Sequence, residues 1–259
     1  REAIELYDRH IYEKGGCVYH MLRTELGDDL FWKSIHTFVR HNAHKTVETI
    51  DLIRAIEQAT GKNVLFLFDQ YVFRGGHPEY KIGYSWDDDN KLAKVTVAQT
   101  QEELFDLKIP IAFGFEGQTE QKTFVVRVFE KEQAFYFPLD TKPSFISFDR
   151  GNNYLKQVTL EYGLAELKAG LQFDPDPLAK IQCAEALAKK GNLEAVKALE
   201  KALLEEPFWG VRVEVADALA SINLDQAFAA LTKGLEDKDA RVRKAVITGL
   251  SKYKTEESL

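Results

Sequence analysis

The sequence has little cysteine and no long apolar run. Its only two cysteines, Cys17 and Cys183, have a spacing that fits neither a disulfide framework nor a metal-binding motif. A reducing cytosol is therefore the expected compartment. No apolar run approaches the roughly 18 residues that a membrane-spanning helix needs, and no signal peptide precedes the first motif. These absences predict a cytoplasmic protein with no membrane segment.

An excess of positive charge and two common site motifs are also missing. The formal net charge of −7 argues against a protein that binds nucleic acid or a membrane surface. No glycine-rich stretch follows a strand in the G-x-G-x-x-G arrangement, so a dinucleotide site is not expected. The zinc-protease motif H-E-x-x-H occurs nowhere in the chain. We therefore expect no metal site of that type within these residues.

What the sequence does contain is ample material for a folded core. Hydrophobic residues make up 45% of the chain and aromatic residues 12%, which excludes a disordered protein. A length of 259 residues is enough for one large domain or for two to three smaller ones. The chain opens on Arg1 and enters its first motif at once, as a piece cut from a longer protein would.

The first motif runs from Tyr7 to Arg23, with the letters YDRHIYEKGGCVYHMLR. Gly15 and Gly16 are expected in the opening turn of a helix, where another backbone or a substrate can come close. Tyr7 and Tyr12 precede this helix, at a position where their phenols can face a cleft. The apolar spacing that predicts the helix is formed by Val18, Met21, Leu22 and Leu26.

Tyr-x-Lys-Gly followed by an apolar helix with Met-Leu-Arg resembles the segment just after the zinc site of the aminopeptidase N family. These gluzincin metallopeptidases remove N-terminal residues from peptides. The resemblance implies that Tyr12 donates a hydrogen bond to the oxyanion of the tetrahedral intermediate. It also implies a substrate-binding role for Tyr7, because some members have a second active-site tyrosine there. The implied cofactor is zinc, held by an H-E-x-x-H and a later glutamate that these residues lack.

The rest of the first region, residues 1–78, is also predicted to be helical. One helix can begin at Thr46 or at Thr49, and Gly61 is placed to end it in a left-handed conformation. The order D-L-x-x-A-I-E-x-A-T-G, then F-D-Q-Y-V, then G-H-P resembles the end of the family's catalytic domain. The resemblance therefore extends over about seventy residues with several ordered landmarks.

From Glu79 the apolar period changes from helical to two, which predicts about seven short strands up to residue 162. Examples are the alternating residues Val95 and Val97, and Ile109 and Ile111. Short strands at this density indicate a small β-sandwich over residues 79–162. The family often has such a domain after its catalytic domain, and the role expected of it is structural.

Residues 163–259 are predicted to be helical and repetitive. Three series of residues recur at intervals of 32 and 31 positions: Lys180, Arg212, Arg243; Ala184, Ala216, Ile247; and Leu187, Leu219, Leu250. Helix pairs of this length with an internal arginine resemble short HEAT-type repeats. Such pairs stack because one pair alone cannot bury its apolar face, so we expect a solenoid with the three leucines in one core. The predicted fold is thus multidomain α+β: the helical end of a gluzincin catalytic domain, a β-sandwich and a HEAT-like solenoid.

The histidines give no strong indication of a metal site. His36, His41 and His44 are close in sequence, but steps of five and three residues spread them around a helix. His20 is expected at a polar helix edge, and His77 in a turn before Pro78. We therefore expect all five to be solvent-exposed or turn histidines and not metal ligands.

Three functions are compatible with the sequence. The preferred one is the C-terminal part of a zinc aminopeptidase that acts on peptides, with the zinc-binding half absent from this chain and the fragment alone inactive. The second is a non-catalytic scaffold, because the family fold also occurs in a TATA-binding-protein-associated factor without a zinc site. The third is an interaction module that binds a protein partner on its helical repeats. The reading frame upstream of Arg1 distinguishes these possibilities.

Overall fold

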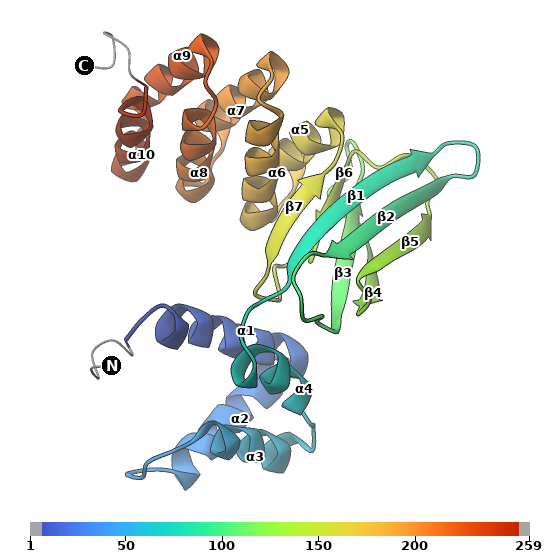
Figure 1. The fold of residues 1–259 in the computed structure, drawn as a ribbon, viewed down its shortest axis with the longest axis vertical. Helices are drawn as coiled ribbons and strands as arrows, with labels where there is room; N and C mark the ends of the chain where they lie inside the picture. The colour runs from blue at the N-terminus through green and yellow to red at the C-terminus, as the bar shows by residue number, and fades with distance from the viewer. Residues whose placement is uncertain (1–6, 254–259) are drawn as a thin grey trace. The chain divides into compact units, whose positions relative to one another are not determined.

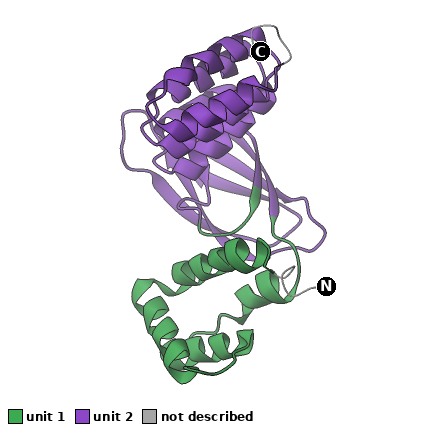
Figure 2. Ribbon diagram, turned by 90° about the vertical axis from the view of Figure 1, so that its left-hand side faces the viewer, with its two compact units in different colours: residues 1–78, 153–157 green, residues 79–152, 158–259 purple. Residues whose placement is uncertain are grey.

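A computed structural model describes residues 7–253, which form two compact units. One unit comprises residues 1–78 and 153–157, and the other residues 79–152 and 158–259 (Figure 2). The first unit is helical, whereas the second combines two β-sheets with the C-terminal helices (Figure 1). No helix among the described residues is both long and apolar enough to cross a membrane.

The first unit is built from short helices in chain order. They are η2 (His10–Lys14, a π-helical turn), α1 (Gly15–Leu26), α2 (Asp28–His41), α3 (Thr49–Thr60), α4 (Leu65–Phe68) and η3 (Asp69–Phe73, π-helical). The predicted stripe of α1 is buried, with Met21 and Leu22 almost completely enclosed. Residues 153–157 complete this unit, since the Tyr71 hydroxyl donates to the Leu155 carbonyl at 3.0 Å and the Tyr154 hydroxyl bonds Glu25.

The start of α3 settles the choice between the two predicted positions. The helix begins at Thr49, and the prediction that Thr46 caps it is wrong. Glu48 is the N-cap and forms a capping box with Asp51, whose carboxylate accepts from the Glu48 amide at 2.9 Å. The box satisfies amides that the first helical turn leaves free, which an isolated Thr46 three residues upstream cannot do. Gly61 ends the helix in the left-handed conformation, as predicted, with φ of 70°.

The second unit contains two antiparallel sheets. The strands are β1 (Glu79–Asp87), β2 (Leu92–Gln99), β3 (Leu107–Gly114), β4 (Lys122–Val128), β5 (Glu132–Pro138), β6 (Phe145–Phe148) and β7 (Gln157–Glu161). One sheet has the order β5-β2-β1-β7 and the other β4-β3-β6. Aromatic pairs join the two sheets: Tyr80 contacts Phe148 at 5.4 Å between ring centroids, and Phe137 contacts Phe113 at 5.1 Å.

The C-terminal helices follow β7 without interruption. They are α5 (Leu164–Phe173), α6 (Pro177–Lys190), α7 (Leu193–Glu205), α8 (Trp209–Ala220), α9 (Asp225–Lys233), η4 (Gly234–Glu236, 3-10) and α10 (Ala240–Leu250). Asp176, Asn192 and Asp239 cap α6, α7 and α10 by accepting hydrogen bonds from backbone amides. The first helices of successive pairs contact one another, α6 with α8 and α8 with α10.

The predicted leucine core is found in the first two helical repeats but not in the third. Leu187 and Leu219 are fully buried, whereas Leu250 is only half-buried. Ile247, the residue equivalent to the buried Ala184 and Ala216, is 59% exposed. On α8 one face is covered by α10. Among the described residues no further helix follows α10, so the corresponding face of α10 stays uncovered.

One buried carboxyl of this region gives a testable pH dependence. Asp174 ends α5, and burial raises its pKa to about 6, although the Asp176 amide donates to it at 2.9 Å. Its neutral form is therefore favoured in the folded protein, and this contribution to stability is lost as the pH rises from about 4 through 6. Between pH 4 and 6 we expect the free energy of unfolding of Asp174→Asn to rise relative to that of the wild type by about 2 kcal/mol.

The measurement is urea unfolding of both proteins between pH 4 and 8, with Asp237→Asn as the control. Burial by itself would raise the pKa of Asp237, but hydrogen bonds from the Arg212 guanidinium and the Asp239 amide lower it overall. Because the Asp237 pKa is lowered from an ordinary value near 4, its contribution changes only below that pH, so the curves of the wild type and Asp237→Asn should stay nearly parallel above about pH 4. Parallel pH curves for the wild type and Asp174→Asn would show that the Asp174 carboxyl is ordinary.

Candidate functional site

Tyr12 lies in a tight π-helical turn directly before α1. The Lys14 amide donates to the Arg9 carbonyl at 2.9 Å, which closes the wider turn, and η2 continues into α1 without a break. Single π-helical turns of this kind are frequent at functional sites. The extra residue in the turn changes the direction in which its side chains point, and this could not be predicted from the helical period.

Local hydrogen bonds brace the start of this turn, and one contact connects its end to another segment of the first unit. Asp8 accepts hydrogen bonds from the His10 amide at 2.8 Å and from its ring Nδ1 at 3.0 Å, and these bonds lower the pKa of the Asp8 carboxyl. At the other end, the Lys14 ammonium donates to the Gly76 carbonyl at 3.3 Å. The start of the turn is thus stabilised within residues 8–10 and its end by one exposed contact, and the Tyr12 side chain is not buried.

The two tyrosines that were predicted as site residues are neighbours. The rings of Tyr7 and Tyr12 stack with centroids 6.4 Å apart and an interplanar angle of 30°. Both side chains are largely exposed, at 64% and 65%. Within residues 7–253 neither phenolic hydroxyl has a hydrogen-bond partner, so each is available to an external acceptor. By contrast, Tyr71 of the same unit is fully buried and its hydroxyl is bonded.

An open hollow of about 590 Å³ lies beside this turn in the same unit. Its wall combines apolar and aromatic side chains of α1, α2, α3, α4 and η3 with charged side chains of both signs, among them Lys14, Arg74 and Glu48. Tyr7 and Tyr12 are not among its lining residues. The sequence did not predict this hollow, because its lining comes from four separate stretches and only the one around α1 carried a candidate site.

The five histidines considered from the sequence lie outside this turn. His36 and His41 are exposed on α2, and His44 follows in a turn with φ of 61°. His20 is exposed on α1, and His77 is half-buried before Pro78. Over residues 7–253, no group of three or more His, Cys, Asp or Glu side chains is placed to hold a metal ion. His10, which the sequence analysis did not single out, is the histidine next to Tyr12 that has a carboxylate partner.

Comparisons with known proteins identify relatives for both ends of the chain. Residues 1–71 match the peptidase family M1 domain, and residues 196–259 match HEAT repeats. Aminopeptidase N of Haemophilus influenzae is 28% identical over 152 residues, which are 52% of this chain and 17% of that protein. Aminopeptidase M1 of Arabidopsis thaliana is 32% identical over 77 residues, 30% of this chain and 9% of that protein.

A solved structure covers nearly the whole chain. Aminopeptidase A of Legionella pneumophila, in complex with aspartic acid, aligns with 98% of this chain at a TM-score of 0.70 and 16% identity. The alignment includes 37% of that protein, and the chain spans less than a fifth of each of the two curated relatives. The first 71 residues are thus similar to part of the peptidase family M1 domain, the residues from 196 onward are similar to HEAT repeats, and the α+β fold is similar to that of an aminopeptidase.

Proposed function

We propose that this chain is the C-terminal part of a zinc-dependent aminopeptidase that removes N-terminal residues from peptides. Tyr12 is the proposed oxyanion donor, and Tyr7 a substrate-binding side chain beside it. The observation that carries the proposal is the exposed Tyr12 hydroxyl, which has no hydrogen-bond partner among residues 7–253, on a hydrogen-bonded π-helical turn inside the segment that matches the M1 domain. A donor that must meet a transient negative charge needs this combination of a fixed backbone and an uncommitted hydroxyl.

In the proposed reaction, the Tyr12 hydroxyl donates to the scissile carbonyl oxygen as negative charge develops there. One such donor is worth about 2.7–4 kcal/mol of transition-state stabilisation. The ring of Tyr7 lies beside that of Tyr12, with the centroids 6.4 Å apart. Tyr7 also presents an aromatic face next to the reacting group, which suits contact with a peptide substrate.

Zinc does not fit the residues described here. Since residues 7–253 offer no ligand set, we assign the metal and the base that activates water to a part of the peptidase outside this chain, and derive no step through them. We further propose a cytoplasmic location for the whole enzyme.

The surface of the first unit supports the idea of a missing neighbour. This small unit exposes many large apolar side chains, among them Ile11, Tyr19, Trp32, Val39, Val47, Phe66 and Phe73. Exposed apolar surface on this scale is typical of a protein interface. We propose that the remainder of the catalytic domain covers it, and that the domain limits lie at residues 1–78, 79–162 and 163–259.

We propose that the two sheets form a small β-sandwich, supported by the aromatic pairs that join them. The helix pairs from α5 to α10 are proposed to form a HEAT-type solenoid, supported by the match over residues 196–259. Neither part supplies a catalytic group in this scheme.

The second candidate is a non-catalytic scaffold that binds a protein partner through its repeats. Two observations favour it: the HEAT-repeat match, and an open groove of about 650 Å³ that several lysines and glutamates of α5 to α7 line. The reading frame upstream of Arg1 decides between the two. An intact H-E-x-x-H with a later glutamate supports the enzyme, whereas a degenerate version supports the scaffold.

For the isolated chain we expect no bound zinc and no hydrolysis of aminoacyl substrates. Three protein ligands and an open position are needed for a catalytic zinc site, and no such set occurs in the described residues. Metal analysis of the purified chain after chelator treatment and zinc reloading provides the measurement. One tightly bound zinc per chain would contradict the prediction and direct attention back to His36, His41 and His44.

A further inference from the structure

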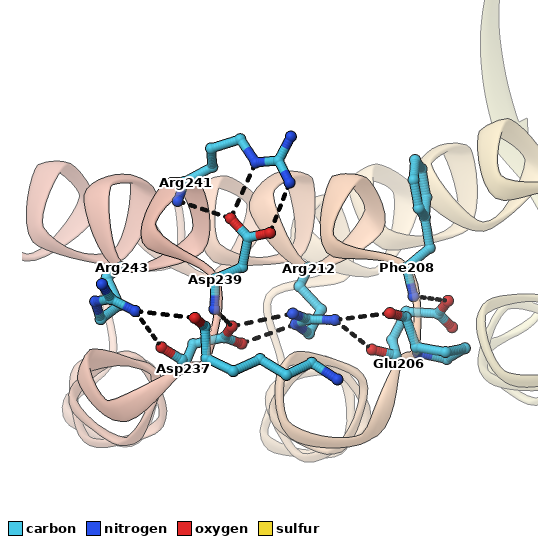
Figure 3. Close-up of polar contacts among 9 residues, drawn as sticks. Glu206, Phe208, Arg212, Asp237, Asp239, Arg241 and Arg243 are labelled. Carbon is cyan, nitrogen blue, oxygen red and sulfur yellow. Dashed lines mark hydrogen bonds and ion pairs between the residues drawn. The ribbon is translucent and has the colours of Figure 1, made fainter.

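Acidic and basic residues connect the helix pairs in a regular series. Lys180 of α6 pairs with Glu206 after α7, with Nζ 2.6 Å from Oε2. Arg212 of α8 pairs with Asp237 after η4, with Nε 2.8 Å from Oδ2 and Nη2 3.0 Å from Oδ1 (Figure 3). We call these residues the ladder. Each base thus binds an acid about 25 residues later, in the turn that ends its helix pair and opens the next one.

Arg212 uses both sides of its guanidinium. Its Nε–Nη2 edge holds the carboxylate of Asp237, while Nη1 donates to the carbonyls of Glu206 at 2.8 Å and Pro207 at 3.0 Å (Figure 3). The Arg212 and Asp237 side chains are almost fully buried. A planar fork that meets a carboxylate through two bonds fixes orientation as well as distance. This pair therefore sets the register between α8 and the turn that leads into α10.

Arg243 of α10 repeats only one half of this arrangement. Its Nη1 donates to the carbonyls of Asp237 at 2.7 Å and Lys238 at 3.2 Å, as Nη1 of Arg212 does in the preceding unit (Figure 3). Its Nε–Nη2 edge, the one that binds the carboxylate in Arg212, has no partner among residues 7–253. The carbonyl bonds hold the side chain in place, so this edge is pre-positioned for an acid.

The apolar surroundings of Arg243 show the same incompleteness. Ile247, one turn after Arg243, is 59% exposed, although its equivalents Ala184 and Ala216 are buried. Leu250 is half-buried, although Leu187 and Leu219 are fully enclosed. The open carboxylate-binding edge and the uncovered apolar residues lie on the same helix at the ladder's own spacing. The uncovered face of α10 thus corresponds to the face of α8 that contacts α10.

We propose that this face of α10 is the docking site for one further helical repeat that continues the array. The repeat would place a carboxylate, in the turn after its helices, on the Nε–Nη2 edge of Arg243. Its apolar residues would cover Ile247 and Leu250, as α10 and its neighbours cover α8. This inference stands whether or not the chain belongs to an active peptidase, because it rests only on the ladder and on burial.

The experiment extends the chain with its own repeat. A second copy of residues 223–253 is attached directly after Tyr253, which places the copy's Asp237 the same number of residues after Arg243 as Asp237 is after Arg212. We expect the extended chain to unfold in urea at a higher midpoint than the original. Two substitutions should each remove much of this gain: Arg243→Gln in the original repeat and Asp237→Asn in the copy. The double variant should lose no more of the gain in midpoint than either single variant.

Arg241 is the matched control, because it is also on α10 but pairs with Asp239 of its own turn. Arg241→Gln should combine additively with the change in the copy. If the losses from Arg243→Gln and from Asp237→Asn in the copy were additive, the proposal would be overturned. It would also be overturned if hydrogen exchange showed that the copy stays unfolded, because the same residues do fold when they follow α8. Dimerisation of the original chain that Ile247→Lys abolishes would assign the face to a second copy of the chain and also overturn it.

Discussion

In the complete enzyme, Tyr12→Phe should reduce kcat on the order of 10²–10³-fold and leave KM nearly unchanged. The hydroxyl would act only as charge develops on the carbonyl oxygen, so its loss affects the transition state and not the bound substrate. Because the ring is exposed and its hydroxyl makes no bond within residues 7–253, the substitution should not alter stability measurably. Steady-state kinetics on an aminoacyl substrate, together with thermal unfolding, measure both effects.

Two tyrosines of the same unit serve as controls. Tyr71 is buried and donates to the Leu155 carbonyl, so Tyr71→Phe should cost about 1 kcal/mol of stability with little change in kcat. Tyr7→Phe keeps the stacked ring and should affect turnover less than Tyr12→Phe. A full-length Tyr12→Phe enzyme with near-normal kcat would remove the oxyanion role and favour the scaffold.

Leu219→Ala should destabilise the second unit by roughly 2–5 kcal/mol. Leu219 is fully buried on α8, which contacts α6, α7, α9 and α10, so its loss leaves a cavity that several helices line. The change in the urea midpoint, with the slope of the transition checked for constancy, gives the magnitude. A difference below about 0.5 kcal/mol is incompatible with a closely packed site.

Leu250→Ala is the matched variant at the equivalent place in the next unit. Leu250→Ala should reduce the free energy of unfolding clearly less than Leu219→Ala, because Leu250 is half-buried and water already reaches part of its side chain. Equal losses at the two positions would mean that Leu250 is enclosed in solution.

Local chemistry was the most predictable part of the fold. The buried stripe of α1 and the left-handed stop at Gly61 follow from spacing and from one residue's backbone freedom, and both are observed. The start of α3 was ambiguous, since Thr46 and Thr49 are both plausible beginnings by residue type. Only the reciprocal bonds of Glu48 and Asp51 decide it, and these depend on the path of the chain.

The site was less predictable than the helices around it. Tyr12 was singled out by a resemblance, and its role remains a proposal. The π-helical turn, the Asp8–His10 contact and the hollow beside it depend on three-dimensional packing that periodicity does not encode. The ladder was partly predictable. The sequence showed its basic residues at a regular spacing, but not their acidic partners 25 or 26 residues later.

The discontinuity of the first unit affects the order in which the protein can fold during synthesis. Tyr154 and Leu155 bond to Glu25 and Tyr71, yet the ribosome makes them only after residues 79–152. The first unit therefore emerges incomplete, with its apolar residues open to other chains while the strands β1 to β6 are still being translated. A translation pause after residue 157 would favour correct closure, whereas a pause just after residue 78 would prolong the exposed state.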